Sequence, residues 1–128
     1  MKKHSPGTRI VGVCAAGAPA MALSWKENNV QSTEAVNTIA DGIAVRQPIP
    51  EVLEDLRSTV DEVLLVEDSS FIEAMQLAFR HHGLVVEPAG AAGLAAALTY
   101  QKRFRGARVV TALTGGNLTS EQIHRWLL

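Results

Sequence analysis

The sequence of 128 residues predicts an α/β fold with a mainly parallel sheet flanked by helices. The run 9–14, RIVGVC, has no polar alternation, which is typical of a strand buried on both faces in a parallel sheet. Further runs of this kind alternate along the chain with segments of helical periodicity. Together these two observations favour strand–helix–strand units within one domain, residues 1–128.

The first half of the chain contains two predicted helices and a second strand. Pro19 suits the first turn of a helix that continues to Lys26 and stops at the Asn28–Asn29 pair. Pro50 opens another helix in the same way. Its apolar residues form a single stripe, made of Val52, Leu53, Leu56 and Val60. The apolar run 62–66 that follows predicts a strand.

The second half predicts three further helices and two further strands. Ser70 and Glu73 have the spacing of a capping box for a helix that ends at Gly83, which suits a C-terminal cap. The strands are expected over 84–86 and 109–113, and an alanine-rich helix over 89–102 lies between them. Thr119 and Gln122 repeat the capping-box spacing and begin the last helix.

Composition excludes several classes of protein. A hydrophobic content of 47% and a net charge of −1 argue against disorder and against a basic nucleic-acid surface. The sequence shows no signal peptide, and no apolar run approaches the ~20 residues of a membrane helix. Cys14 is the only cysteine, so no disulfide can form within the chain. We therefore expect a cytoplasmic protein with no nucleic-acid or membrane partner.

Two glycine-bearing turns carry the functional signal. The segments 87–93, EPAGAAG, and 113–117, LTGGN, each follow a short β-branched run and lead into a predicted helix. Such turns bring backbone close to the carboxyl edge of a sheet, where open α/β sheets hold ligands. The pattern favours a site for a small flat cofactor. Each turn alone is equally typical of a plain strand-to-helix connection.

With these motifs the chain resembles the threonine dehydratase and serine racemase family of pyridoxal-phosphate enzymes, which have the tryptophan-synthase-like fold. The resemblance rests on four short motifs that occur in the family's order. They are IVGV at 10–13, TIADG at 38–42, EPAG at 87–90 and LTGGN at 113–117. It implies that residues 1–128 are the C-terminal portion of a catalytic domain, a partial large domain of that fold.

The resemblance also implies cofactor-binding roles for six residues. Thr114 would place its hydroxyl near the pyridine nitrogen of pyridoxal phosphate, and Gly115 and Gly116 would clear space under the ring. The backbone of Asp41 and Gly42 would pass beside the ring. Glu87 would lie near it.

Two elements that the family places upstream are absent from this sequence. None of the four lysines, Lys2, Lys3, Lys26 and Lys102, lies in the Ser-Xaa-Lys context of the Schiff-base lysine, and there is no glycine-rich phosphate loop. We therefore expect no catalytic residue here, no pyridoxal phosphate bound by the chain alone and no lyase activity. The stretch 14–20, CAAGAPA, lacks the carboxylates with which some relatives hold Mg²⁺ or Ca²⁺, so no metal is expected either.

Two functional hypotheses follow. The first is a fragment of a threonine or serine dehydratase-like lyase, whose parent reaction is β-elimination to a 2-oxo acid and ammonia. The second is a non-catalytic α/β module that acts by self-association or by binding a partner. An unpaired sheet edge would favour a homodimer or association with the missing N-terminal portion.

Overall fold

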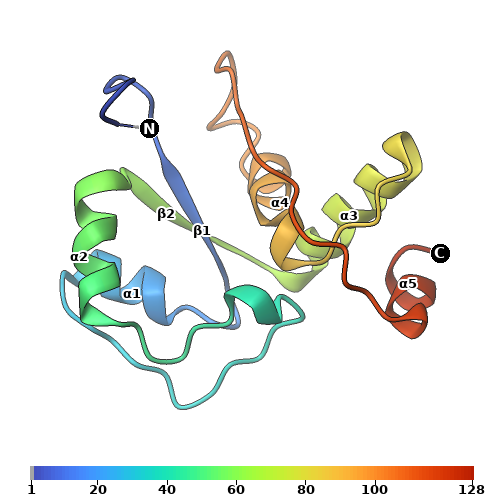
Figure 1. Cartoon of the computed structure of the whole chain (residues 1–128), viewed down its shortest axis with the longest axis horizontal. Helices are drawn as coiled ribbons and strands as arrows, with labels where there is room; N and C mark the ends of the chain where they lie inside the picture. The colour runs from blue at the N-terminus through green and yellow to red at the C-terminus, as the bar shows by residue number, and fades with distance from the viewer. Residues whose placement is uncertain (1) are drawn as a thin grey trace.

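The computed structural model describes residues 2–128 and confirms the α/β class (Figure 1). Two parallel strands, β1 and β2, pair in a register that places Val11 opposite Glu62 and Ala15 opposite Val66. Helices and short 3-10 turns surround them. The elements are β1 (Val11–Ala15), α1 (Ala20–Glu27), η1 (Asp41–Ile43), α2 (Pro50–Thr59), β2 (Glu62–Val66), α3 (Asp68–His82), η2 (Ala89–Ala91), α4 (Ala92–Thr99) and α5 (Ser120–Trp126).

Ionic contacts hold the start of both strands together. Lys2 Nζ lies 2.7 Å from a carboxylate oxygen of Asp61, and Ile10 N–H donates to the same carboxylate. Both contacts lower the pKa of Asp61, the hydrogen bond from Lys2 most strongly. Glu62 forms ion pairs with both Arg9 and Arg103. The amino end of the sheet is thus closed by charged side chains.

Most helix ends follow the predicted signals. Asn28 and Gly83 adopt left-handed conformations, with φ of 56° and 65°, and cap α1 and α3. Thr119 and Gln122 form a reciprocal capping box at the start of α5. The capping box predicted for Ser70 and Glu73 is wrong, because the N-cap of α3 is Glu67, three residues before Ser70, and this cap makes no side-chain hydrogen bond.

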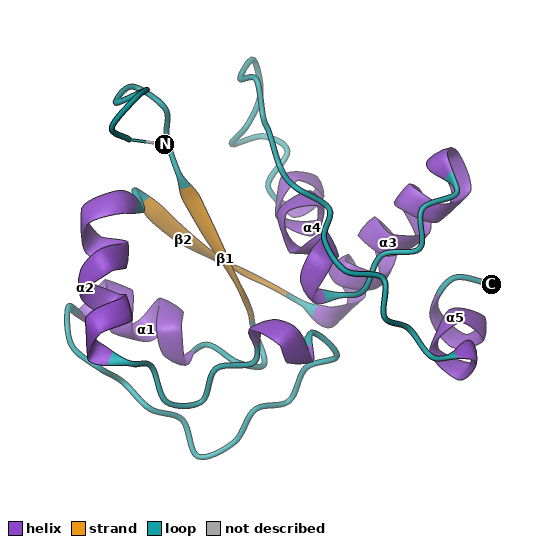
Figure 2. Cartoon of the chain, in the orientation of Figure 1, coloured by secondary structure: helices purple, strands orange, loops and turns teal. Residues whose placement is uncertain are grey.

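The two strands predicted in the second half are wrong as paired strands. Residues 84–86 and 109–113 form no ladder and are drawn as loop in Figure 2. Just beyond these ranges, Glu87 N–H donates to Gly115 O and Thr114 N–H donates to Gly90 O. The β-branched residues are present, but a strand also needs an edge to pair with. The helix predicted for 89–102 starts as η2 and ends at Thr99.

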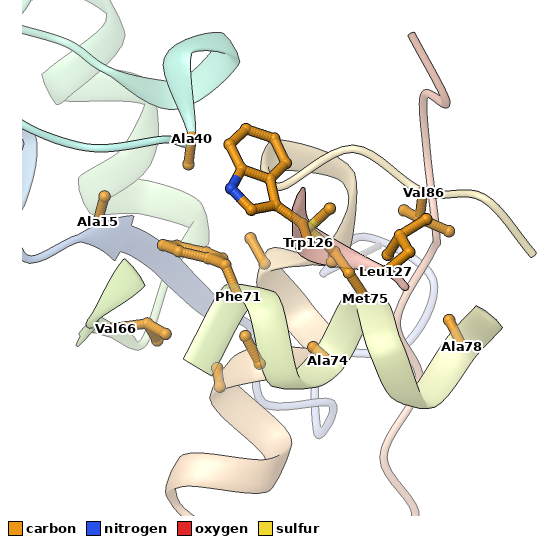
Figure 3. Packing of buried hydrophobic residues seen from close by; sticks show 14 of the residues in the cluster. Ala15, Ala40, Val66, Phe71, Ala74, Met75, Ala78, Val86, Trp126 and Leu127 are labelled. Carbon is orange, nitrogen blue, oxygen red and sulfur yellow. The ribbon is translucent and has the colours of Figure 1, made fainter. Parts of the chain in front are cut away.

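The core lies between β1, α3, α4 and α5 (Figure 3). Phe71 and Met75 on α3 are fully buried, and Val66 at the end of β2 is 1% exposed. Trp126 brings α5 into this core, where Gln76 Nε2 donates to its carbonyl oxygen at 2.9 Å. Most of the other buried core residues are alanines, whose small side chains allow helices and strands to pack closely.

Across residues 2–128, no helix combines the length and apolar character needed to cross a membrane.

Candidate functional site

The site is built first by a loop that is fixed to the carboxyl end of β1. Asn37 N–H donates to Gly17 O at 2.8 Å. A Cβ on Gly17 would lie 1.8 Å from Asn37 O, so only glycine permits this approach. The loop that leads to Asp41 and Gly42 therefore leaves the sheet at one defined position.

The carboxylate of Asp68 holds the same loop from the other side. Its Oδ1 accepts a hydrogen bond from Thr38 Oγ1 at 2.5 Å, and its Oδ2 accepts one from Ile39 N–H at 3.0 Å. Asp68 is the first residue of α3, where a negative charge is also favoured by the helix dipole. This contact places the turn of η1 beside the end of β2. Within η1, Asp41 Oδ1 accepts from Gly42 N–H at 2.8 Å.

Glu87 connects that turn to the 114–117 segment. Its N–H donates to Gly115 O at 3.2 Å, and its Oε2 accepts from Asn117 N–H at 3.3 Å. A Cβ on Gly42 would lie 3.9 Å from Glu87 Oε1, and one on Gly115 would lie 2.4 to 2.6 Å from the Glu87 carboxyl group. The Glu87 carboxylate thus lies between two glycines that come from distant parts of the chain.

Thr114 and Gly116 lie on either side of Gly115 and contact the 85–90 segment. A Cβ on Gly90 would lie 1.4 Å from Thr114 O, and one on Gly116 would lie 2.7 Å from Val85 O. Gly115 has a φ of 66°, which favours glycine. The side chain of Thr114 is exposed and its hydroxyl makes no hydrogen bond within residues 2–128. A hydroxyl donor and acceptor is therefore available at this surface.

The structure brings all six predicted residues, Asp41, Gly42, Glu87, Thr114, Gly115 and Gly116, into one neighbourhood. The arrangement presents two carboxylates and one hydroxyl around backbone without side chains. A flat ligand can approach such backbone closely, and the Thr114 hydroxyl can donate a hydrogen bond to an acceptor atom or accept one from a donor. The cofactor-binding role of these residues stays a prediction.

Sequence reasoning missed the two residues that position the site. The pattern around Asp68 indicates only a favourable charge at a helix start, and its contacts with Thr38 and Ile39 depend on tertiary structure. Asn117, whose N–H donates to Glu87, belongs to a predicted motif but has no predicted role of its own. The only sequence signal for Asn117 was its position directly after the Gly115–Gly116 pair.

The site contains neither a lysine nor a cluster of metal-ligating side chains among residues 2–128. Lys2 is paired with Asp61 at the amino end of the sheet, opposite the site. Within residues 2–128, no three His, Cys, Asp or Glu side chains converge as a metal site would require. Cys14 lies within β1, where burial raises the pKa of its thiol, so the thiol is protonated at neutral pH.

Comparison with known proteins gives the same family. Residues 1–115 match the family model described as pyridoxal-phosphate dependent enzyme. L-threonine ammonia-lyase of Geobacter sulfurreducens is 34% identical over 123 residues, which are 96% of this chain and 31% of that enzyme. L-threo-3-hydroxyaspartate ammonia-lyase of a Pseudomonas species is 32% identical over 99 residues, covering 77% of this chain and 31% of that enzyme.

Solved structures agree in fold. The processed form of threonine deaminase isoform 2 from Solanum lycopersicum superposes with a TM-score of 0.90 at 26% identity, over 97% of this chain and 35% of that one. Maize serine racemase gives a TM-score of 0.82 at 29% identity, over 97% of this chain and 39% of that one. The chain thus spans about a third of the length of these proteins. The family model matches residues 1–115, about nine-tenths of this chain, so the chain belongs to the pyridoxal-phosphate-dependent enzyme family.

Proposed function

We propose that this chain forms one wall of the cofactor pocket of a threonine or serine dehydratase-like lyase. The proposal rests chiefly on one observation, the Glu87 carboxylate held between Gly42 and Gly115. Three separate segments meet there and leave glycine backbone exposed. The resemblance in sequence to threonine ammonia-lyases supports the choice of substrate class, a β-hydroxy amino acid.

The residues present fit one side of a pyridoxal-phosphate site. A Cβ on Gly115 or Gly116 would collide with Glu87 or Val85, so internal packing requires glycine at both positions. Both glycines are exposed, which leaves their backbone accessible to a flat ring. Thr114 would meet the ring nitrogen with its free hydroxyl. Because a hydroxyl is neutral, it cannot hold that nitrogen protonated as a carboxylate would.

Pyridoxal phosphate, when bound, supplies the electron sink for α-proton removal and loss of a β-substituent. The chain's own residues contribute orientation. Glu87 is fixed by its hydrogen bonds to Gly115 and Asn117, and its carboxylate lies next to Gly42 of η1. In the proposed complex, the Thr114 hydroxyl would donate a hydrogen bond to the ring nitrogen, and the glycine backbone would exclude water from one face.

Alone, the chain is proposed to have no lyase activity. It carries no lysine in a cofactor-anchoring motif and no glycine-rich loop for the phosphate. A few hydrogen bonds at one wall would have to offset several kcal/mol lost on immobilising a ligand. The proposed setting is the cytoplasm, which suits a chain whose single cysteine can form no disulfide within it.

The test adds the missing part in trans. The chain is co-expressed with the portion of the Geobacter L-threonine ammonia-lyase that precedes the matched stretch, and 2-oxo acid formation from L-threonine is measured. We expect activity from the two-chain complex and none from the chain alone mixed with pyridoxal phosphate. Activity of the chain alone would contradict the proposed inactivity, and an inactive but cofactor-loaded complex would contradict the proposed reaction.

Thr114 provides the sharpest variant within that complex. Thr114→Ala should lower kcat/KM about tenfold, the loss of one hydrogen bond of roughly 1.4 kcal/mol. Thr114→Ser keeps the hydroxyl and should retain activity within about twofold, because the hydrogen bond is unchanged. Steady-state kinetics and the cofactor's absorption spectrum check both variants. Equal losses in the two variants would argue against a role for the hydroxyl.

A further inference from the structure

Helix α5 follows the 114–117 segment after a connection of two residues, Leu118 and Thr119. Hydrogen bonds order this connection. Leu118 N–H donates to Gly116 O at 2.9 Å, and Thr119 forms the capping box that begins the helix. The position of α5 therefore sets where the 114–117 segment ends.

The 114–117 segment is held less firmly on its other sides. Residues 108–113, which lead into it, are exposed and form no backbone–backbone hydrogen bond in the described chain. In Figure 1 they belong to an extended loop. The hydrogen bonds between the 87–90 and 114–117 segments measure 3.2 and 3.3 Å, at the long end of the usual range. The connection to α5 is thus the firmest attachment of the 114–117 segment.

Helix α5 is in turn stabilised by packing on α3. With seven residues, α5 is too short to be stable in isolation. Trp126 and Leu127 at its end are 9% and 6% exposed, and they join the buried cluster that contains Phe71 and Met75 of α3 (Figure 3). The C-terminal end of α5 is therefore the part that holds this helix in place.

Gln76 of α3 adds a directed contact at the same end. Its Nε2 donates to Trp126 O at 2.9 Å, and its Oε1 accepts from Arg80 Nη2 at 3.0 Å. Because a guanidinium can only donate, Arg80 determines which end of the amide faces α5. The last carbonyls of a helix have no partner within the helix, so Gln76 satisfies an oxygen that burial would otherwise leave unpaired.

We propose that Gln76 is a positioning residue for the cofactor wall, by which we mean residues 41–42, 87 and 114–116. Gln76 fixes the end of α5, and α5 fixes the placement of Thr114. The inference rests on the proposed function, because it gives Gln76 a part in aligning the Thr114 hydroxyl with the cofactor ring. Gln76 itself is not one of the wall residues and acts on the reaction only through α5.

Gln76→Glu tests this contact at nearly constant size. An ionised glutamate still accepts from Arg80 but has no N–H to donate to Trp126 O. Amide hydrogen exchange and ¹⁵N amide shifts of the chain alone measure the result without cofactor. We expect exchange in α5 to become about tenfold faster, as the loss of one hydrogen bond implies, and the amides of residues 115–117 to shift. The amides of α2 should be unchanged.

Gln101→Glu is the matched control. Gln101 is exposed, and its side chain makes no hydrogen bond within residues 2–128, so this variant should leave α5 and the 115–117 amides unchanged. Gln76→Leu is the second test variant, which introduces no charge and should give the same changes as Gln76→Glu. Circular dichroism should show all three variants folded. Unchanged 115–117 amides in both Gln76 variants would overturn the inference.

Kinetics separate positioning from a merely structural role. In the complex with the upstream portion of the Geobacter enzyme, Gln76→Glu should lower kcat for L-threonine by roughly three- to tenfold and leave KM within about twofold. With Thr114→Ala already present, Gln76→Glu should lower kcat by less than about twofold, because Gln76 acts through the Thr114 hydroxyl. A full additional loss would overturn the inference. Shifted 115–117 amides, with no lyase activity even in the unmodified complex, would uphold the placement of the wall by Gln76 and contradict the proposed function.

Discussion

Gly90→Ala is expected to destabilise the chain by about 3 kcal/mol, the upper range for overpacking a tight contact. The added Cβ would lie 1.4 Å from Thr114 O and 2.5 Å from Thr114 C, which are backbone atoms that no side-chain rotation can move aside. The same clash would separate the 113–116 segment from η2 and break the hydrogen bond from Thr114 N–H to Gly90 O. Urea unfolding at equilibrium measures the loss.

Gly7→Ala is the control for that experiment. Apart from its two neighbours in the chain, nothing lies within 4 Å of a Cβ at Gly7, so the expected change in the free energy of unfolding is within about 0.5 kcal/mol. If Gly90→Ala were as stable as Gly7→Ala, the close packing of the 114–116 backbone on η2 would be contradicted.

Phe71→Ala is expected to cost about 3–5 kcal/mol, the usual range for truncating a buried phenylalanine. Phe71 is 0% exposed and lies between β1, β2 and the Trp126 ring (Figure 3). Its removal leaves a cavity at the junction of the sheet with α3 and α5. For a chain of this size the loss is a large share of the total stability.

Thermal unfolding checks this prediction, with Leu128→Ala as the control. Leu128 is 79% exposed, so its truncation should shift the melting temperature by only about one or two degrees. Phe71→Ala should lower the melting temperature by more than about ten degrees. A small shift in melting temperature for Phe71→Ala would contradict the placement of Phe71 in the buried core.

Local signals in the sequence predicted the boundaries that depend on local chemistry. The apolar run 62–66 coincides with β2, and Pro50 begins α2. The αL caps at Asn28 and Gly83 and the capping box at Thr119 were all predictable, because each depends on residues within one turn.

Tertiary contacts account for what was wrong. Helix α3 begins at Asp68 rather than at the Ser70 capping box, and the Asp68 side chain holds Thr38 and Ile39, which lie 30 and 29 positions earlier in sequence. The segments 84–86 and 109–113 have strand-forming residues, but pairing needs a neighbouring edge, which propensity cannot provide. The arrangement around Glu87 was reached only through the resemblance to a family, since no local pattern brings residues 42, 87 and 115 together.

Nuclear magnetic resonance can show whether residues 41–42, 87 and 114–116 form one wall of a pyridoxal-phosphate pocket. The ¹⁵N-labelled chain is bound to the unlabelled upstream portion of the Geobacter enzyme, and amide shifts are recorded before and after cofactor addition. We expect shifts at Gly42, Glu87, Gly115 and Gly116, and none in α2. Cofactor binding that leaves these four amides unmoved would contradict it.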